Sequence, residues 1–256
     1  MVKTSHLLLV LIRLFLGYLF FSAGVCKLTG GNFGQLMGPP WLEEALAKHG
    51  LGLFAQVVAI SQVIIGALLM SQRYSLLGAI MLVPMNVAIL AVTVSQNWAG
   101  TPYVNSVFLA LNLVLLLMER QKFAFLVNPM ATHTINPALT DKFGQNMYSW
   151  IGLVLCLFII VAARYNLMLT NVLATFIFFS FALTILSDKI LGKLDRLLFG
   201  LPFLAMLIVT FANLTGLAVP ALLVILAAEA ILLGIRIYSG NRSQDTSATG
   251  VVAGNV

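Results

Sequence analysis

The sequence predicts an all-α integral membrane protein with about eight transmembrane helices, and its composition and long apolar runs carry that prediction. Hydrophobic residues make up 61% of the 256 residues, and charged residues only 9%. Soluble domains are about 45–50% apolar and about 25% charged, so no water-soluble core of this size would bury so much apolar surface. Continuous apolar runs favour helices over a barrel, because a helix satisfies its backbone polar groups within its own segment.

Eight apolar runs approach the length of about 20 residues that crosses about 30 Å of hydrocarbon. They are residues 7–26, 51–71, 75–95, 103–118, 149–163, 168–187, 197–214 and 217–238. The fourth and fifth runs are the shortest. The connection 28–50 contains "PWLEEALAKHG", which predicts a short surface helix that begins at a proline and ends at Gly50.

The runs divide the chain into four predicted segments. Residues 1–125 hold the first four spans, and residues 149–238 hold four more. Residues 126–148 form a predicted cytoplasmic linker, in which two Asn-Pro steps mark turns. Residues 239–256 are polar and rich in small side chains, which predicts a disordered cytoplasmic tail.

The net charge of +6 reflects topology rather than a nucleic-acid partner, because the cations lie at the ends of apolar runs and form no basic face. With the N-terminus inside, the cytoplasmic segments hold ten Lys and Arg residues and the outer segments hold three. This asymmetry predicts a multi-pass protein of the inner (cytoplasmic) membrane with both termini in the cytoplasm.

The first span, "RLFLGYLFFSAGVCKL", carries two cations in a segment otherwise suited to hydrocarbon. Arg13, Gly17, Gly24 and Lys27 are spaced by 4, 7 and 3 residues, which puts them on one face of a helix. Gly17 and Gly24 are predicted helix-packing residues, because glycine lets a neighbouring helix approach closely. Lys27 is expected to snorkel to the outer interface. Arg13 lies deeper and either snorkels inward or meets a partner.

Polar residues within spans are the candidates for function, because a charge at the bilayer centre costs about 2.5–3.5 kcal/mol. Asn105, Asn112 and Glu119 recur every seven residues, and Glu119 falls on the same side of the membrane as Arg13. Glu229 is an isolated acid near the middle of the eighth span. The candidate intramembrane polar site therefore comprises Arg13, Asn86, Asn112, Glu119 and Glu229. The alternative is that the amides only hold helices together, at about 0.6 kcal/mol each.

The sequence contains no enzyme motif that assigns catalytic residues. It lacks HExxH, CxxC, a Walker loop and a Gly-rich dinucleotide loop. Two cysteines are too few and too far apart for a metal or disulfide framework, so no metal is predicted. The three histidines lie outside the spans, which argues against a haem within the bilayer.

The opening stretch resembles the start of DoxX-like membrane proteins: an Arg followed by Leu-Gly, an aromatic run, Ala-Gly and a Lys. The helix "WLEEALAKHGLG" and the stretch "MLVPMNVAILAVTVSQNWAGTPYVNSVFLALNLVLLL" extend the resemblance over about residues 8–125. The resemblance implies an N-terminal four-helix membrane bundle. It also implies a role beside redox proteins, since the family includes a subunit of a thiosulfate:quinone oxidoreductase and subunits linked to thiol proteins. The four additional spans depart from that pattern.

Three functions remain open at this point. The first is a membrane subunit or anchor associated with quinone- or thiol-linked redox proteins, with a quinone or a soluble oxidoreductase as partner besides the lipid bilayer. The second is a small-solute transporter, which eight spans and Glu229 would suit. The third is a non-catalytic scaffold or assembly factor. The sequence fixes neither the ligand nor the oligomeric state.

Overall fold

The structure is a computed structural model that describes residues 4–38, 41–126, 139–212 and 218–252, and within these ranges its regular elements are all helical. Its α-helices are α1 (Thr4–Leu28), α2 (Leu42–Ala47), α3 (Gly52–Met70), α4 (Ser75–Ser95), α5 (Thr101–Met118), α6 (Met147–Ala162), α7 (Leu167–Leu186), α8 (Lys193–Thr210) and α10 (Ala218–Val252). Two 3-10 helices, η1 (Arg120–Leu126) and η2 (Leu139–Gln145), lie between α5 and α6. The predicted all-α membrane class is confirmed.

Each of the eight predicted apolar runs overlaps one long helix. Within the described residues, six helices are long and apolar enough to cross a membrane: α1, α3, α4, α5, α7 and α10. The apolar α6 has only 16 residues. α8 opens with three charged side chains, Lys193, Asp195 and Arg196, which shorten its apolar part. These two helices account for the difference between eight predicted runs and six spans.

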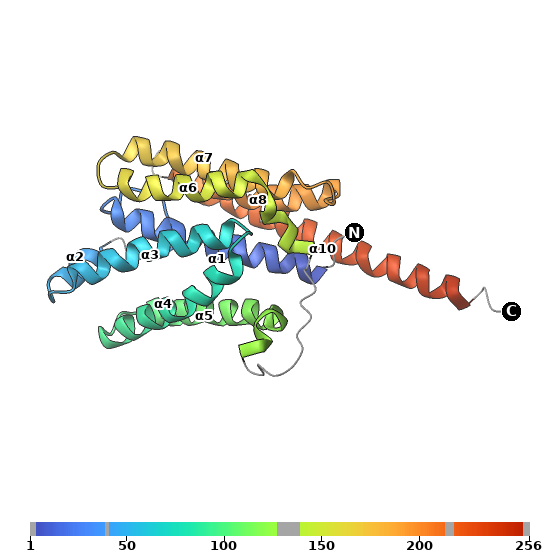
Figure 1. Ribbon diagram of the computed structural model, residues 1–256, viewed down its shortest axis with the longest axis horizontal. Coiled ribbons are helices and arrows are strands. Elements are labelled where there is room, and N and C mark those ends of the chain that lie inside the picture. Colours follow the sequence, from blue (N-terminus) through green and yellow to red (C-terminus); the bar gives the residue numbers. More distant parts are fainter. Residues whose placement is uncertain (1–3, 39–40, 127–138, 213–217, 253–256) are drawn as a thin grey trace.

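The helices lie in layers around α1 (Figure 1). α3 packs along α1, and the antiparallel pair α4 and α5 lies on one side of this central layer. α6, α7 and α8 lie on the other side, and α10 packs mainly on α8. α1 has the most buried apolar segment of the six spanning helices. α1 begins and α10 ends at the same end of the molecule.

Glycines bring α1 and α3 into close contact. A Cβ on Gly24 would lie 2.6 Å from the backbone oxygen of Ala59, and one on Gly17 would lie 2.6 Å from Cγ of Met70. On the facing helix, a Cβ on Gly66 would lie 2.5 Å from the oxygen of Gly17. A Cβ on Gly24 or Gly66 would thus meet a backbone atom, so a side chain at either position would force the helices apart, whereas at Gly17 the nearest atom belongs to a side chain.

The outer helices expose large apolar side chains over much of their surface. On α10 the exposed residues include Leu223, Val224, Leu226 and Ile231, and on α6 they include Leu157, Phe158 and Val161. A soluble protein rarely exposes contiguous apolar patches of this kind. The arrangement therefore suits contact with lipid.

The connecting segments differ in part from the sequence predictions. The predicted surface helix is present as α2, and Gly50 has a φ of +73° beyond its end. Much of the predicted linker, residues 127–138, lies outside the described residues, and residues 139–145 form η2. α10 continues to Val252, whereas disorder was predicted from residue 239. Extending an existing helix adds one hydrogen bond per residue and avoids the cost of nucleation, which composition alone does not reveal.

Candidate functional site

Arg13 is fully buried and forms an ion pair with Glu119 at the end of α5. Its Nη2 contacts Oε1 of Glu119, and its Nη1 donates a hydrogen bond of 3.1 Å to Oε1 of Gln72. Gln72 follows α3 with a left-handed φ of +57° and donates from Nε2 to the backbone oxygen of Leu69 at 3.2 Å. Of the two alternatives predicted for Arg13, the structure therefore shows pairing with a side chain from another part of the chain, not snorkelling.

The ion pair continues into a chain of alternating charges. Nζ of Lys122 lies 3.2 Å from Oε1 of Glu119 and 2.5 Å from Oδ1 of Asp141. Two cations and two carboxylates from α1, α5, η1 and η2 thus balance one another. Attraction between opposite charges offsets part of the cost of removing each of them from water.

α5 also donates two amide hydrogen bonds to α4. Nδ2 of Asn105 lies 2.9 Å from the backbone oxygen of Asn86, and Nδ2 of Asn112 lies 2.9 Å from that of Ala79. Both side-chain atoms of Asn86 and Oδ1 of Asn112 are buried and have no hydrogen-bond partner within the described residues. Asn86 and Asn112 therefore lie at one interface, but their side chains do not bond to each other.

Glu229 does not join the other predicted site residues. It lies half-buried on α10, and no hydrogen bond or ion pair of its side chain is found within the described part of the chain. The neighbouring cation Arg236 instead contacts Asp195 of α8, with 2.6 Å between Nε and Oδ1. This second buried ion pair was missed, although Asp195 in the first turn of a helix was a visible signal.

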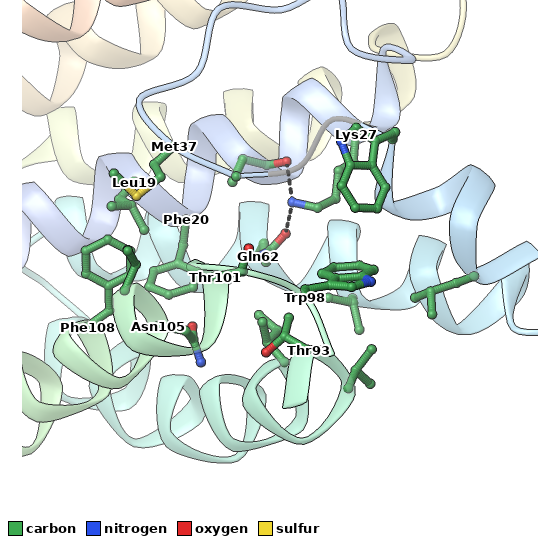
Figure 2. A pocket seen from close by; sticks show the side chains of 18 of the residues that line it. Leu19, Phe20, Lys27, Met37, Gln62, Thr93, Trp98, Thr101, Asn105 and Phe108 are labelled. Atoms are coloured by element: carbon green, nitrogen blue, oxygen red, sulfur yellow. Dashed lines mark hydrogen bonds between the residues drawn. The ribbon is translucent and has the colours of Figure 1, made fainter. Parts of the chain in front are cut away.

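A cavity of about 380 Å³ opens toward the other end of α1, between α1, α3 and the α4–α5 pair. Its walls are mostly apolar and aromatic, as Figure 2 shows. The polar lining comes from Lys27, Gln62, Thr93, Thr101 and Asn105. Trp41, ahead of α2, and Trp98, in the α4–α5 turn, also line the cavity and meet edge-to-face with ring centroids 4.8 Å apart.

Lys27 is the charged group of this cavity. Its side chain is 3% exposed, and Nζ donates to the backbone oxygen of Ala23 at 3.0 Å and to Oε1 of Gln62 at 3.1 Å (Figure 2). The expectation that Lys27 snorkels to the interface is therefore wrong. Gln62 on the adjacent helix gives the ammonium a polar partner, and this keeps it inside the protein.

The predicted site residues do not converge on this cavity. None of Arg13, Asn86, Asn112, Glu119 and Glu229 lines it, whereas Asn105 does. The geometry thus separates two features. The ion-pair cluster, which we define as Arg13, Gln72, Glu119, Lys122 and Asp141, lies near the start of α1, and the cavity lies near its end. Within the described residues, no group of His, Cys, Asp and Glu side chains is arranged to hold a metal.

Comparison with known proteins places the first part of the chain in a family. Residues 8–95 match the DoxX family model. The uncharacterized protein YwoB of Bacillus subtilis (strain 168) is 28% identical over 123 residues, which cover 43% of this chain and 76% of that protein. No solved structure matches. The first part of this multi-pass membrane protein is therefore a DoxX domain, as the motifs of its first span implied.

Proposed function

We propose that this protein is a membrane subunit that binds a quinone in the cavity beside Lys27 and serves a soluble oxidoreductase. The observation that carries the proposal is a buried ammonium group on the wall of an otherwise apolar cavity. The DoxX domain supports it, since that family resemblance implies redox partners.

The cavity suits the chemistry of a quinone head group. Ligand pockets are usually about 300–1,000 Å³ and mostly apolar, with a few polar groups that fix orientation. An ammonium has three N–H donors, and Lys27 directs two of them at Ala23 and Gln62. The third donor remains for a carbonyl oxygen of the ligand. Aromatic side chains such as Phe20, Phe108 and Trp98 provide flat apolar contacts for the ring.

In this proposal the chain binds and orients the ligand, while a partner protein exchanges electrons with it. A bound quinone supplies two-electron redox chemistry. Lys27 and Gln62 would fix the carbonyl, and the apolar walls would exclude water from the ring. The sequence offers no catalytic motif of its own, so a soluble oxidoreductase is the natural source or acceptor of electrons.

The same proposal includes a location in the inner membrane with both termini in the cytoplasm. The excess of Lys and Arg in alternate connections supports this orientation. The start of α1 and the end of α10 at one end of the molecule agree with it (Figure 1). In this orientation the ion-pair cluster lies toward the cytoplasm and the cavity toward the outside.

Tryptophan fluorescence tests the proposal, because two of the three tryptophans line the cavity. The protein carrying Trp150→Phe is reconstituted in nanodiscs and titrated with decylubiquinone, whose ring should quench Trp41 and Trp98 in a saturable way. Lys27→Met removes a charged hydrogen-bond donor worth about 1.5–3 kcal/mol, which corresponds to about a ten- to hundredfold higher Kd.

The matched control is Lys48→Met, which removes a lysine whose side chain is exposed outside the cavity. It should leave the Kd unchanged. Quenching that does not saturate, or an equal Kd for wild type and Lys27→Met, would contradict the proposal.

A further inference from the structure

Four pairs of positions that repeat every seven residues follow the antiparallel helices α4 and α5 and the turns at their ends. The residues of these pairs are Thr93 with Trp98, Asn86 with Asn105, Ala79 with Asn112, and Gln72 with Glu119. In the first pair, which closes the turn between α4 and α5, the backbone nitrogen of Trp98 donates to the backbone oxygen of Thr93 at 3.0 Å. In the second and third pairs, the asparagine side chain of α5 donates to a backbone oxygen of α4, at 2.9 Å in both. In the fourth pair, Gln72 and Glu119 both bind Arg13. We call these four pairs the polar ladder.

The polar ladder runs from the cavity to the ion-pair cluster. Thr93, Trp98 and Asn105 line the cavity, and Glu119 belongs to the cluster. The ladder follows the whole of α5, whose 18 residues rise about 27 Å. This distance is close to the thickness of the hydrocarbon core of a bilayer, about 30 Å.

Buried polar atoms without partners concentrate on this ladder and on Arg13 at its end. Within the described residues, eight buried side-chain atoms lack a hydrogen-bond partner, and five of them belong to Arg13, Asn86, Asn112 and Glu119. They are Nε of Arg13, both amide atoms of Asn86, Oδ1 of Asn112 and Oε2 of Glu119. Such atoms are costly in a bilayer, where lipid offers no donor or acceptor, so they normally bind internal water.

We propose that the polar ladder is a proton path between the cavity and the cytoplasmic end of the protein. Internal water bound to Asn86 and Asn112 would form its middle, and Glu119 would exchange protons with the cytoplasmic end. Intramembrane carboxylates that face the protein interior commonly belong to such relays. The role of this path in supplying protons to a reduced quinone rests on the function proposed above, whereas proton conduction along the path does not.

Apolar side chains lie between successive pairs of the ladder. Leu82 lies between two pairs on α4, Leu115 lies between two on α5, and Leu16 of α1 packs in the same cluster; all three are fully buried. Water would bridge these stretches only in short-lived chains. The path would therefore carry protons slowly and exclude ions such as K⁺.

Proton flux into vesicles tests this inference without a quinone or a partner protein. The protein is reconstituted in phosphatidylethanolamine–phosphatidylglycerol vesicles containing pyranine, and valinomycin with a K⁺ gradient drives proton entry. Wild type should acidify the interior faster than empty vesicles. Asn112→Leu, which removes a water-binding amide, and Glu119→Gln, which removes the proton-exchanging group, should both fall to the rate of empty vesicles.

Asn171→Leu is the matched control, since Asn171 also has a buried oxygen without a partner but lies on α7, away from the ladder. It should retain the wild-type flux. A wild-type flux equal to that of empty vesicles, or an equal loss in Asn112→Leu and Asn171→Leu, would overturn the path. Tryptophan quenching by decylubiquinone separates the two proposals. Proton flux without quinone binding would support the proton path and contradict the proposed quinone site. Quinone binding without proton flux would support the quinone site and contradict the path.

Discussion

Replacement of Gly24 by alanine should separate α1 from α3 and destabilise the protein. The new Cβ would lie 2.6 Å from the oxygen of Ala59 and 2.9 Å from the nitrogen of Val63, both backbone atoms of α3. Ordinary contact begins at 3.4 Å, so α3 has to move by about 0.8 Å. Overpacking of this kind usually costs about 1–3 kcal/mol.

The same substitution at Gly200 provides the control. No atom lies within 4 Å of a Cβ at this position of α8, so Gly200→Ala adds no clash. Alanine is favoured over glycine in a helix by about 1 kcal/mol in water, so this variant should be as stable as wild type or more stable.

Unfolding in mixed micelles of dodecyl maltoside and SDS, followed by circular dichroism, measures both variants. Gly24→Ala should unfold at a lower SDS fraction than wild type, and Gly200→Ala should not. If the two variants unfold at the same SDS fraction, the close approach of α1 and α3 at Gly24 is not what stabilises this pair of helices.

Three further predictions concern the ion pair, a helix cap and the topology. Arg13→Gln leaves Glu119 with Lys122 as its neighbouring cation and removes the fully buried one, which should cost up to about 3–5 kcal/mol in the same unfolding assay. Arg13→Gln combined with Glu119→Gln should recover part of the loss, and equal stability of the single and double variants would show that the pair is not coupled. Asn146→Ala removes the N-cap acceptor of α6, which lies 3.2 Å from the nitrogen of Ser149, and should lower the stability by about 0.5–2 kcal/mol. An unchanged unfolding midpoint would contradict this role of Asn146. Cysteines introduced at Lys48 and at Ser243 should react with an impermeant maleimide from opposite sides of the membrane, and labelling from one side would contradict both the orientation and the number of spans.

The fold was largely predictable because hydrophobic runs and helical spacing are local properties of the sequence. The pairing of Arg13 with Glu119 was also accessible, since both lie toward one end of apolar helices and carry opposite charges. Gln72, which completes that contact, was not accessible, because it lies in a turn and reaches Arg13 only through its left-handed backbone. Likewise, the bond between Asn105 and Asn86 uses a backbone oxygen, and side-chain patterns do not reveal such acceptors.

The cavity was missed because burial of a lysine depends on what the neighbouring helix offers. Lys27 lies at the end of an apolar run, and in an isolated helix its ammonium would reach the interface. In the protein, Gln62 accepts its hydrogen bond, so the charge remains inside. Gln62 lies in the middle of the next span, so the sequence alone did not pair it with a lysine at the end of the first span.

The two cations of α1 link the two candidate features through one rigid element. Arg13 and Lys27 are fourteen residues apart, about 21 Å along the helix, and lie near opposite ends of the domain. Between them, Gly17 and Gly24 fix α1 against α3, which carries Gln62 and leads into Gln72. A shift of α1 by one turn along α3 would therefore break the contacts of both cations together. Because a buried charge without its partner is costly, the close packing at the glycines and the two polar partners select the same register of α1.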